Sequence, residues 1–188
     1  MRSLVPGTTF TYDADDGSEH NVVEVTHATK VILGVPCIEV HDTVMSHGQL
    51  TEDTLDWFSQ DVEGNVWYFG EHSEQLEDGM IVGLEGSWEG GVDGAKPGIV
   101  MKADPVVEDV YRQEFSPSVA EDAAQILSLS ESVTVPFGQF DHCLETKEFS
   151  TLEPDAIENK FYALKVGFIL SVDLGTGVRL ELVSVTFH

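Results

Sequence analysis

Positive charge is scarce in this sequence. Its 188 residues include 9 Lys and Arg against 34 Asp and Glu, which gives a formal net charge of −25 and a pI near 4.2. Nucleic acids and anionic membrane surfaces are bound mainly through basic contacts. The composition therefore argues against both as partners, and we predict no nucleic-acid binding.

Cysteines and long apolar runs are also few. Cys37 and Cys143 alone cannot build a disulfide scaffold, and their apolar neighbours favour buried free thiols. One bridge remains an alternative if the protein works outside the cytoplasm. No apolar run approaches the roughly 18 residues of a membrane-spanning helix. The start, Met1-Arg2-Ser3, shows no signal peptide and is expected to lead almost at once into a strand. We therefore expect a cytosolic chain or a mature form whose leader was removed.

Motifs that identify enzymes or cofactor sites are missing. There is no Gly-rich phosphate cradle, GxSxG, HExxH or CxxC, and we predict no cofactor. His142 and Cys143 are adjacent, so on a strand they point to opposite faces, the imidazole outward and the thiol inward. The acidic run 13–19 is similar to a calcium loop but lacks its 12-residue spacing. A hairpin turn is the favoured interpretation, with divalent-cation binding as an alternative.

Alternating apolar and polar residues with frequent turn residues are plentiful, and they predict an all-β protein. Short turns favour an antiparallel meander forming a barrel or curved half-barrel, in a single domain over residues 1–188. We expect one long Gly-rich loop over 85–104 and at most a short helical turn in 116–124. Strands are predicted over 8–12, 20–27, 30–33, 37–46, 50–71 (a hairpin), 80–84, 106–115, 126–135, 139–149, 156–164, 168–172 and 178–187.

The hairpin over 50–71 is predicted to organise the fold. Pairing Gln60 with Asn65 places Trp57 opposite Tyr68, and a bulge at the turn would shift this register by one residue. Without the bulge, Trp57 and Trp67 face opposite sides of the sheet. Trp57 is then expected in the core, and Trp67 in a cavity.

The acidic residues are spread along the whole chain rather than gathered in a tail. Such an even distribution of acidic residues favours a solvated surface adapted to salt, as in a halotolerant protein. Cation binding and a cationic partner are the two alternatives.

Three segments carry a resemblance to a known group. The sequences PGTTFTY from Pro6, VPFGQF from Val135 and FYALKVGFI from Phe161 resemble turn and strand motifs of uncharacterised secreted bacterial β-rich domains with a half-barrel or barrel, lipoprotein-like architecture. The usual tyrosine-alanine-proline-glycine sequence reads Tyr162-Ala163-Leu164-Lys165 here. The resemblance implies a fold and an extracytoplasmic (periplasmic or secreted) location, with no active site.

The candidate binding site combines aromatic and charged residues. Arg112 is one of only nine cations and lies in a strand of valines and aromatics; it is expected either to hold the barrel through an internal ion pair or to clamp an anion in a cavity. Trp88 is a candidate lid residue in the Gly-rich loop, or a plug of the core. The predicted ligand-binding residues are Trp67, Glu71, Trp88, Arg112 and Glu114.

These features favour a non-catalytic, extracytoplasmic protein that binds a small or lipidic ligand, or a partner, in an aromatic and acidic cavity. The first alternative is a barrel enzyme that uses Asp56, Glu71 or Glu114 as acid or base beside Arg112. The second is a calcium-binding protein. The sequence leaves the oligomeric state open.

Overall fold

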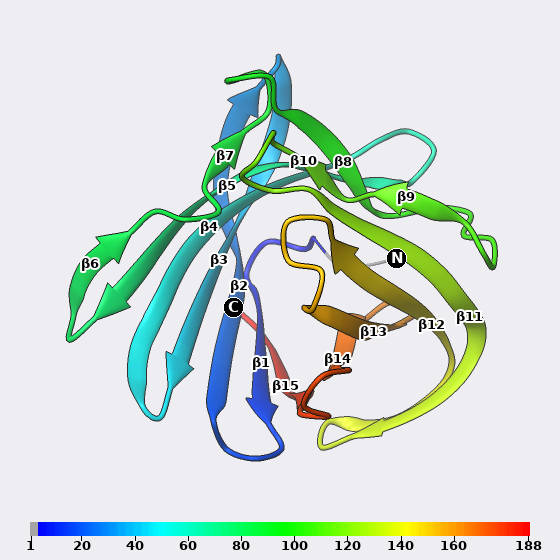
Figure 1. The fold of residues 1–188 in the computed structure, drawn as a ribbon. Helices are drawn as coiled ribbons and strands as arrows, with labels where there is room; N and C mark the ends of the chain where they lie inside the picture. The colour runs from blue at the N-terminus through cyan, green and yellow to red at the C-terminus, as the bar shows by residue number, and fades with distance from the viewer. Residues whose placement is uncertain (1–3) are drawn as a thin grey trace.

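The computed structural model describes residues 4–188, which form strands and turns with no helix (Figure 1). The first strands are β1 (Thr8–Ala14), β2 (Glu19–Ile32), β3 (Val35–Ser46), β4 (Gln49–Gln60) and β5 (Val66–Glu77). Short strands follow: β6 (Met80–Gly83), β7 (Trp88–Glu89), β8 (Lys96–Met101), β9 (Val110–Arg112) and β10 (Glu114–Phe115). The last are β11 (Asp122–Val135), β12 (Gly138–Ser150), β13 (Ile157–Ala163), β14 (Gly167–Asp173) and β15 (Arg179–Phe187). Met1, Arg2 and Ser3 lie outside the described residues.

The strands form one antiparallel sheet that is nearly closed into a barrel. Its order is β10-β8-β5-β4-β3-β2-β1-β15-β14-β13-β12-β11-β9, with β6 and β7 also paired to β5. The two ends of this order, β9 and β10, are consecutive in the chain and are separated by Gln113 alone. One short segment therefore pairs with β11 on one side and β8 on the other, leaving a single seam. The predicted all-β meander is confirmed.

The Gly-rich segment 85–104 is not the irregular loop that its composition predicted, because it contains β7 and β8, both paired with β5. Its glycines serve close strand contacts as well as turns. A Cβ on Gly98 would lie 2.3 Å from the carbonyl oxygen of Gln113; on the β5 side of the same contacts, one on Gly70 would lie 2.4 Å from that of Trp88. Segment 106–115 is correspondingly split into β9 and β10, and a Ser116–Ala120 bridge stands where a helical turn was expected.

The register of the β4–β5 hairpin differs by one residue from the predicted pairing. Gln60 pairs with Val66, and Phe58 pairs with Tyr68, so the five-residue segment 61–65 forms the turn. The Asp61 carboxylate organises this turn by accepting hydrogen bonds from three backbone N–H groups and from the Trp67 indole Nε1. A bulge at Phe69 then brings Trp57 opposite Gly70.

This register places Trp57 and Trp67 on the same face of the sheet, so the prediction of opposite faces is wrong. Trp57 is buried in an outer cluster with Ile32, Cys37 and Phe69, and Trp67 packs against that cluster from a half-buried position. The expectation that Trp57 belongs to a core is confirmed. Cys37 is a buried free thiol, as predicted.

The opposite face of β4 and β5 looks into the barrel. Phe58 and Tyr68 point inward and stack with ring centroids 4.7 Å apart. A larger core of alternate residues from β1, β2, β3, β14 and β15 lines the same interior; its buried members include Tyr12, Val25, Val40, Ile169 and Leu182. The β4–β5 hairpin is therefore packed on both sides, and its inner side borders the barrel lumen.

Candidate ligand cavity in the barrel lumen

The interior of the barrel contains two adjoining cavities. One has a volume of about 200 Å³ and the other about 580 Å³. Six aromatic and valine side chains line both cavities, so the two form the ends of one lumen: Tyr12, Val23, Val40, Phe58, Tyr162 and Phe168. The larger volume alone falls within the roughly 300–1,000 Å³ that is common for small-molecule sites.

The smaller cavity is the apolar end of the lumen. Apart from the six shared residues, it is lined by residues from the N-terminal segment, β1, β2, β5, β8, the β13–β14 turn and the start of β14: Leu4, Phe10, Val25, Val66, Val100, Met101, Val166 and Gly167. None of these side chains carries a charge. This end can receive an apolar group but offers it almost no hydrogen bonds.

The larger cavity is the polar end. It extends to the β1–β2 turn and the β14–β15 turn, where Ser18, Glu19, Asp173 and Thr176 line it. In Figure 1 both turns lie at the lower end of the barrel. Among the lining residues that the structure describes, five are carboxylates and one is a cation: Glu19, Asp42, Asp56, Glu158, Asp173 and Lys160.

Asp42 and Asp56 form the acidic wall of this end. Asp42 on β3 pairs with Thr54, and Asp56 on β4 pairs with Val40, so the two carboxylates are diagonal neighbours on the inner face. Burial, together with the nearby charge of Asp56, raises the pKa of Asp42 to about 7. Burial likewise raises the pKa of Asp56 to about 7.

Tyr68 holds the Asp56 carboxylate in place. Its hydroxyl donates a hydrogen bond of 2.5 Å to Asp56 Oδ1, and this bond opposes part of the burial effect on the pKa of Asp56. The stacking of Phe58 on Tyr68 fixes the ring that carries this donor. The aromatic pair of the hairpin thus positions an acid at the boundary between the apolar and polar ends.

The wall opposite Asp42 is built by β12 and β13. Lys160 Nζ lies 2.8 Å from Glu148 Oε2 and 3.7 Å from a Glu158 oxygen. The Tyr162 hydroxyl and the Thr146 hydroxyl both donate to Glu148 Oε1, at 2.9 and 3.1 Å. Lys160 holds the pKa of Glu148 below its usual range despite burial. The charge of Lys160 is therefore largely committed to this network.

Two acceptor atoms beside the acidic wall have no partner. Asn21 is only 8% exposed, and its Oδ1 is buried without a hydrogen bond among the described residues; the same holds for Asp42 Oδ1. Both Asn21 and Asp42 line the polar cavity. A buried acceptor left unpaired costs about 1–3 kcal/mol, so such groups usually have a structural or functional explanation.

Three of the predicted site residues come together, next to the lumen wall. Trp88 is buried, and its indole Nε1 donates a 2.8 Å hydrogen bond to Glu114 Oε2. Glu71 pairs with Trp88 along β5 and β7. Burial raises the pKa of Glu71 to about 9 and that of Glu114 to about 8. Trp88 packs edge-on against Tyr68, so it plugs the core between β5 and β10.

The other two predicted site residues lie away from this cluster. Trp67 is on the outer face, where it lines a surface recess of about 370 Å³ with Phe69 and Pro97. Arg112 is exposed, and its guanidinium lies 4.8 Å from the centroid of the Phe115 ring. The structure therefore does not bring Arg112 beside Asp56 or Glu71, because β9 turns this side chain outward.

Other residues singled out in the sequence serve local structure. The run 13–19 forms the β1–β2 turn, in which Asp16 Oδ1 accepts a hydrogen bond from the backbone N–H of Ser18. Within residues 4–188, no group of three or more His, Cys, Asp or Glu is arranged to hold a metal ion. Nor does that range include a helix with the length and hydrophobicity to span a membrane. Cys143 is a buried free thiol beside the exposed His142, as predicted.

Of the residues that line the polar end, sequence reasoning named Asp56 only as a candidate acid or base and missed Asp42 and Asn21. Such residues can be recognised in a sequence as polar side chains at inward positions of an otherwise apolar strand face. Asp42 stands between Val40 and Val44 at the alternate positions of β3, and Asn21 precedes Val23 in the same way on β2. A search for polar residues that interrupt an apolar face would have found both.

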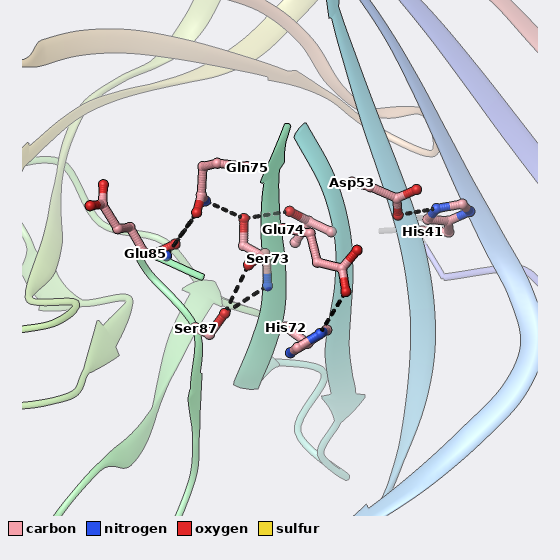
Figure 2. Close-up of polar contacts among 9 residues, drawn as sticks. His41, Asp53, His72, Ser73, Glu74, Gln75, Glu85 and Ser87 are labelled. Atoms are coloured by element: carbon pink, nitrogen blue, oxygen red, sulfur yellow. Dashed lines mark hydrogen bonds and ion pairs between the residues drawn. The ribbon is translucent and has the colours of Figure 1, made fainter. Parts of the chain in front are cut away.

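The outer face of the same strands shows how acids are accommodated elsewhere. Figure 2 shows His41 Nε2 paired with Asp53, at 2.7 Å, and His72 Nε2 paired with Glu74, at 3.3 Å. On the other side of β5, Ser73 and Gln75 bond to the segment that follows β6, through Ser87 and Glu85 (Figure 2). The outward acids Asp53 and Glu74 thus have partners within the chain.

Comparisons with known proteins leave the family open. No family model matches the sequence, and a search of curated proteins finds no relative. Among solved structures, a candidate lipoprotein from Parabacteroides distasonis is similar with a TM-score of 0.48 and 12% sequence identity, over 98% of this chain and 97% of that chain. We therefore interpret the cavity from its own residues.

Proposed function

We propose that the protein binds a small amphipathic or lipidic molecule in the barrel lumen, without chemistry. The observation that carries this proposal is the pair of adjoining cavities in the lumen, apolar at one end and polar at the other. An amphipathic molecule would place its apolar part among Phe10, Val66 and Met101 and its polar part near Asp42 and Asp56. Ligand sites commonly combine apolar walls with a few fixed polar groups in this way.

The wall of the lumen supports binding because its polar groups are held in place. Tyr68 fixes Asp56, and Glu148 fixes Lys160, through hydrogen bonds of 2.5 and 2.8 Å. Groups that are ordered before binding lose little conformational freedom when the ligand arrives, which favours affinity. Arg112 is exposed beside Phe115, which supports binding in the lumen over the enzyme alternative that placed Arg112 beside the acids.

Titration calorimetry with 1-decanol tests this function. The alcohol has an apolar tail and an uncharged head, so it probes the lumen without testing charge. We expect binding of one molecule per chain, with a negative heat-capacity change from burial of the tail. An absence of binding by decanol and by shorter and longer alkanols would overturn the proposal.

A matched pair of variants locates the binding. Val23 lines both parts of the lumen, whereas its neighbour Val22 on β2 lines neither. Val23→Trp should fill the lumen and abolish decanol binding, whereas Val22→Trp should leave it intact. Thermal melts of both variants verify that each is folded. Equal binding by folded Val23→Trp and wild type would place the alcohol outside the lumen and contradict the proposal.

The proposal includes a location outside the cytoplasm. It rests on the resemblance of the turn motifs near Pro6, Val135 and Phe161 to those of secreted bacterial proteins. Fractionation of cells of the source organism, with detection of the native protein by antibody, tests it. Recovery in the cytoplasmic fraction alone would contradict this part of the proposal and leave ligand binding unaffected.

A further inference from the structure

We propose that the polar head of the ligand is a cation, and that Asp42 and Asp56, with Asn21, bind an alkylammonium group at the polar end of the lumen. This inference rests on the proposed function, because it names the class of ligand for the same cavity. It is carried by the placement of the acceptors, by the charge of the wall and by the chemistry of the unpartnered atoms.

The three acceptors follow one diagonal across the inner face of three neighbouring strands, with Asp42 in the middle. Asn21 on β2 pairs with Val44, one inward position along β3 from Asp42, and Asp42 is in turn the diagonal neighbour of Asp56 on β4. Diagonal neighbours in a sheet are separated by roughly 7–8 Å, a span that one ligand head can bridge. The same strands carry Val23, Val40 and Phe58, which border the apolar end.

The charge of the wall favours a positive head. The lining carboxylates are balanced within the cavity only by Lys160, among the residues described, and Lys160 already contacts Glu148 and Glu158. Two further carboxylates, Glu19 and Asp173, line the cavity near its turns. They extend the negative potential toward the end of the barrel and would attract a cation from solution.

The unpartnered atoms require a donor. Asn21 Oδ1 and Asp42 Oδ1 are hydrogen-bond acceptors, and Asp42 and Asp56 in their ionised forms only accept. A primary ammonium group offers N–H donors and no acceptor, so beside Asp42 it can donate to Asp42 and to one of its diagonal neighbours. A carboxylate or phosphate head would bring acceptors to acceptors and would be repelled by the acids.

The protonation behaviour of the two acids agrees with this assignment. Burial and neighbouring carboxylates raise the pKa of Asp42 to about 7, and burial raises that of Asp56 to about 7. The groups that act on them include Glu19, Glu52, Tyr68, His41 and Lys160. A cation beside buried acids favours their charged forms. An ammonium head would therefore supply the charge that this wall lacks.

Three probes with the same tail separate charge from burial. Decylammonium, 1-decanol and decanoate are titrated into the wild-type protein at pH 8 by calorimetry. Charge-assisted hydrogen bonds contribute about 1.5–3 kcal/mol each, so we expect decylammonium to bind roughly 10- to 100-fold more tightly than decanol. Decanoate should bind more weakly than decanol.

Variants assign this preference to the acidic wall. Asp42→Asn and Asp56→Asn keep the size of the side chain and remove its charge. Each should reduce the ratio of decylammonium to decanol affinity by about 10-fold or more. Asp53→Asn is the matched control, because Asp53 lies on the outer face of the same strand and pairs with His41 (Figure 2). It should leave the ratio unchanged.

The outcomes separate this inference from the proposed function. Binding of decanol without a preference for decylammonium would overturn the cation assignment and leave the function standing. Tighter binding of decanoate would also overturn it and would assign the head to Lys160. A preference that survives in folded Asp42→Asn and Asp56→Asn would contradict the role of these residues. Binding of none of the probes would overturn the function itself.

Discussion

The two faces of the β4–β5 hairpin treat their polar groups differently. On the outer face, Asp53 pairs with His41 and Glu74 pairs with His72 (Figure 2), and the amino group of Lys30 lies 3.4 Å from the centroid of the Trp57 ring. On the inner face, Asp56 has the hydroxyl of Tyr68 as its donor and no ion pair among the described residues. The outer-face acids Asp53 and Glu74 thus have histidine partners, whereas Asp56 has no ion pair, and beside it on β2 and β3 the acceptors Asn21 Oδ1 and Asp42 Oδ1 have no hydrogen-bond partner among the described residues.

This difference supports the proposal that the inner face binds a second molecule. A protein that needed only a stable barrel could pair its inner acids as it pairs its outer ones, or replace them with apolar residues. Burying unpaired carboxylates costs stability, which proteins often tolerate at functional sites. The inner face is therefore interpreted as the binding face and the outer face as structural.

The largest expected effect comes from truncating the outer aromatic core. Trp57 is buried and Trp67 is half-buried, so Trp57→Ala should lower the free energy of unfolding by about 3–5 kcal/mol and Trp67→Ala by less. Neither variant should alter decanol binding, provided that it is folded, because both rings are outside the lumen. Urea melts measure the losses. A larger loss for Trp67→Ala would contradict the packing described.

A pH-dependent effect is expected at the inner acid. The pKa of Asp56 is raised from 3.8 to about 7 in the folded state, so the folded protein binds more protons than the unfolded chain between these values. The contribution of Asp56 to the free energy of unfolding therefore falls as the pH rises from about 4 to about 7. Asp56→Asn should raise the melting temperature relative to wild type more at pH 8 than at pH 4.5.

The outer-face variant again supplies the control. Asp53→Asn removes the partner of His41 and should give no gain in melting temperature at pH 8. A gain of equal size in both variants would show that general charge reduction is responsible, and the distinction between the faces would fail.

A smaller effect is expected when the donor to Asp56 is removed. Tyr68→Phe keeps the ring that stacks on Phe58 but deletes the hydroxyl that bonds to Asp56 Oδ1. The loss of one hydrogen bond should lower the free energy of unfolding by about 1 kcal/mol, and the pKa of Asp56 should rise further. Chemical denaturation and NMR titration of the carboxylate measure the two changes. An unchanged pKa would show that the hydroxyl does not act on Asp56.

The smallest effect is expected from salt. With a net charge of −25, repulsion among surface acids should weaken as the Debye length falls from about 30 Å at 0.01 M to about 3 Å at 1 M. The melting temperature should be higher in 1 M NaCl than in dilute buffer. Buried groups are screened much less than exposed ones. The gain of Asp56→Asn over wild type at pH 8 should therefore persist in salt, and its disappearance would place Asp56 in contact with solvent.

Much of the fold could be predicted because the alternation of residues and the turn chemistry are local. They gave the antiparallel meander and most of the strands, together with the buried thiols. The hairpin register could not be predicted, because it depends on the length of the Asp61 turn and on the bulge at Phe69. A one-residue shift moved Trp67 to the outer face.

The site was only partly predictable for a related reason. Glu71, Trp88 and Glu114 do lie together, but β9 carries Arg112 outward, and only the closed barrel shows this. Asp42 and Lys160 come from strands far apart in the sequence, and their shared cavity depends on how the sheet curls. Local patterns can identify an inward polar residue, but they cannot show what lies across the lumen.

The location of a bound ligand tests the central claim most directly. We would determine the crystal structure of the protein with 10-bromo-1-decanol and locate the bromine by its anomalous scattering. The account predicts one bromine at the apolar end of the lumen, near Phe10, Val66 and Met101, with the hydroxyl toward Asp42. A bromine in the outer recess beside Trp67 and Pro97, with none in the lumen, would contradict it.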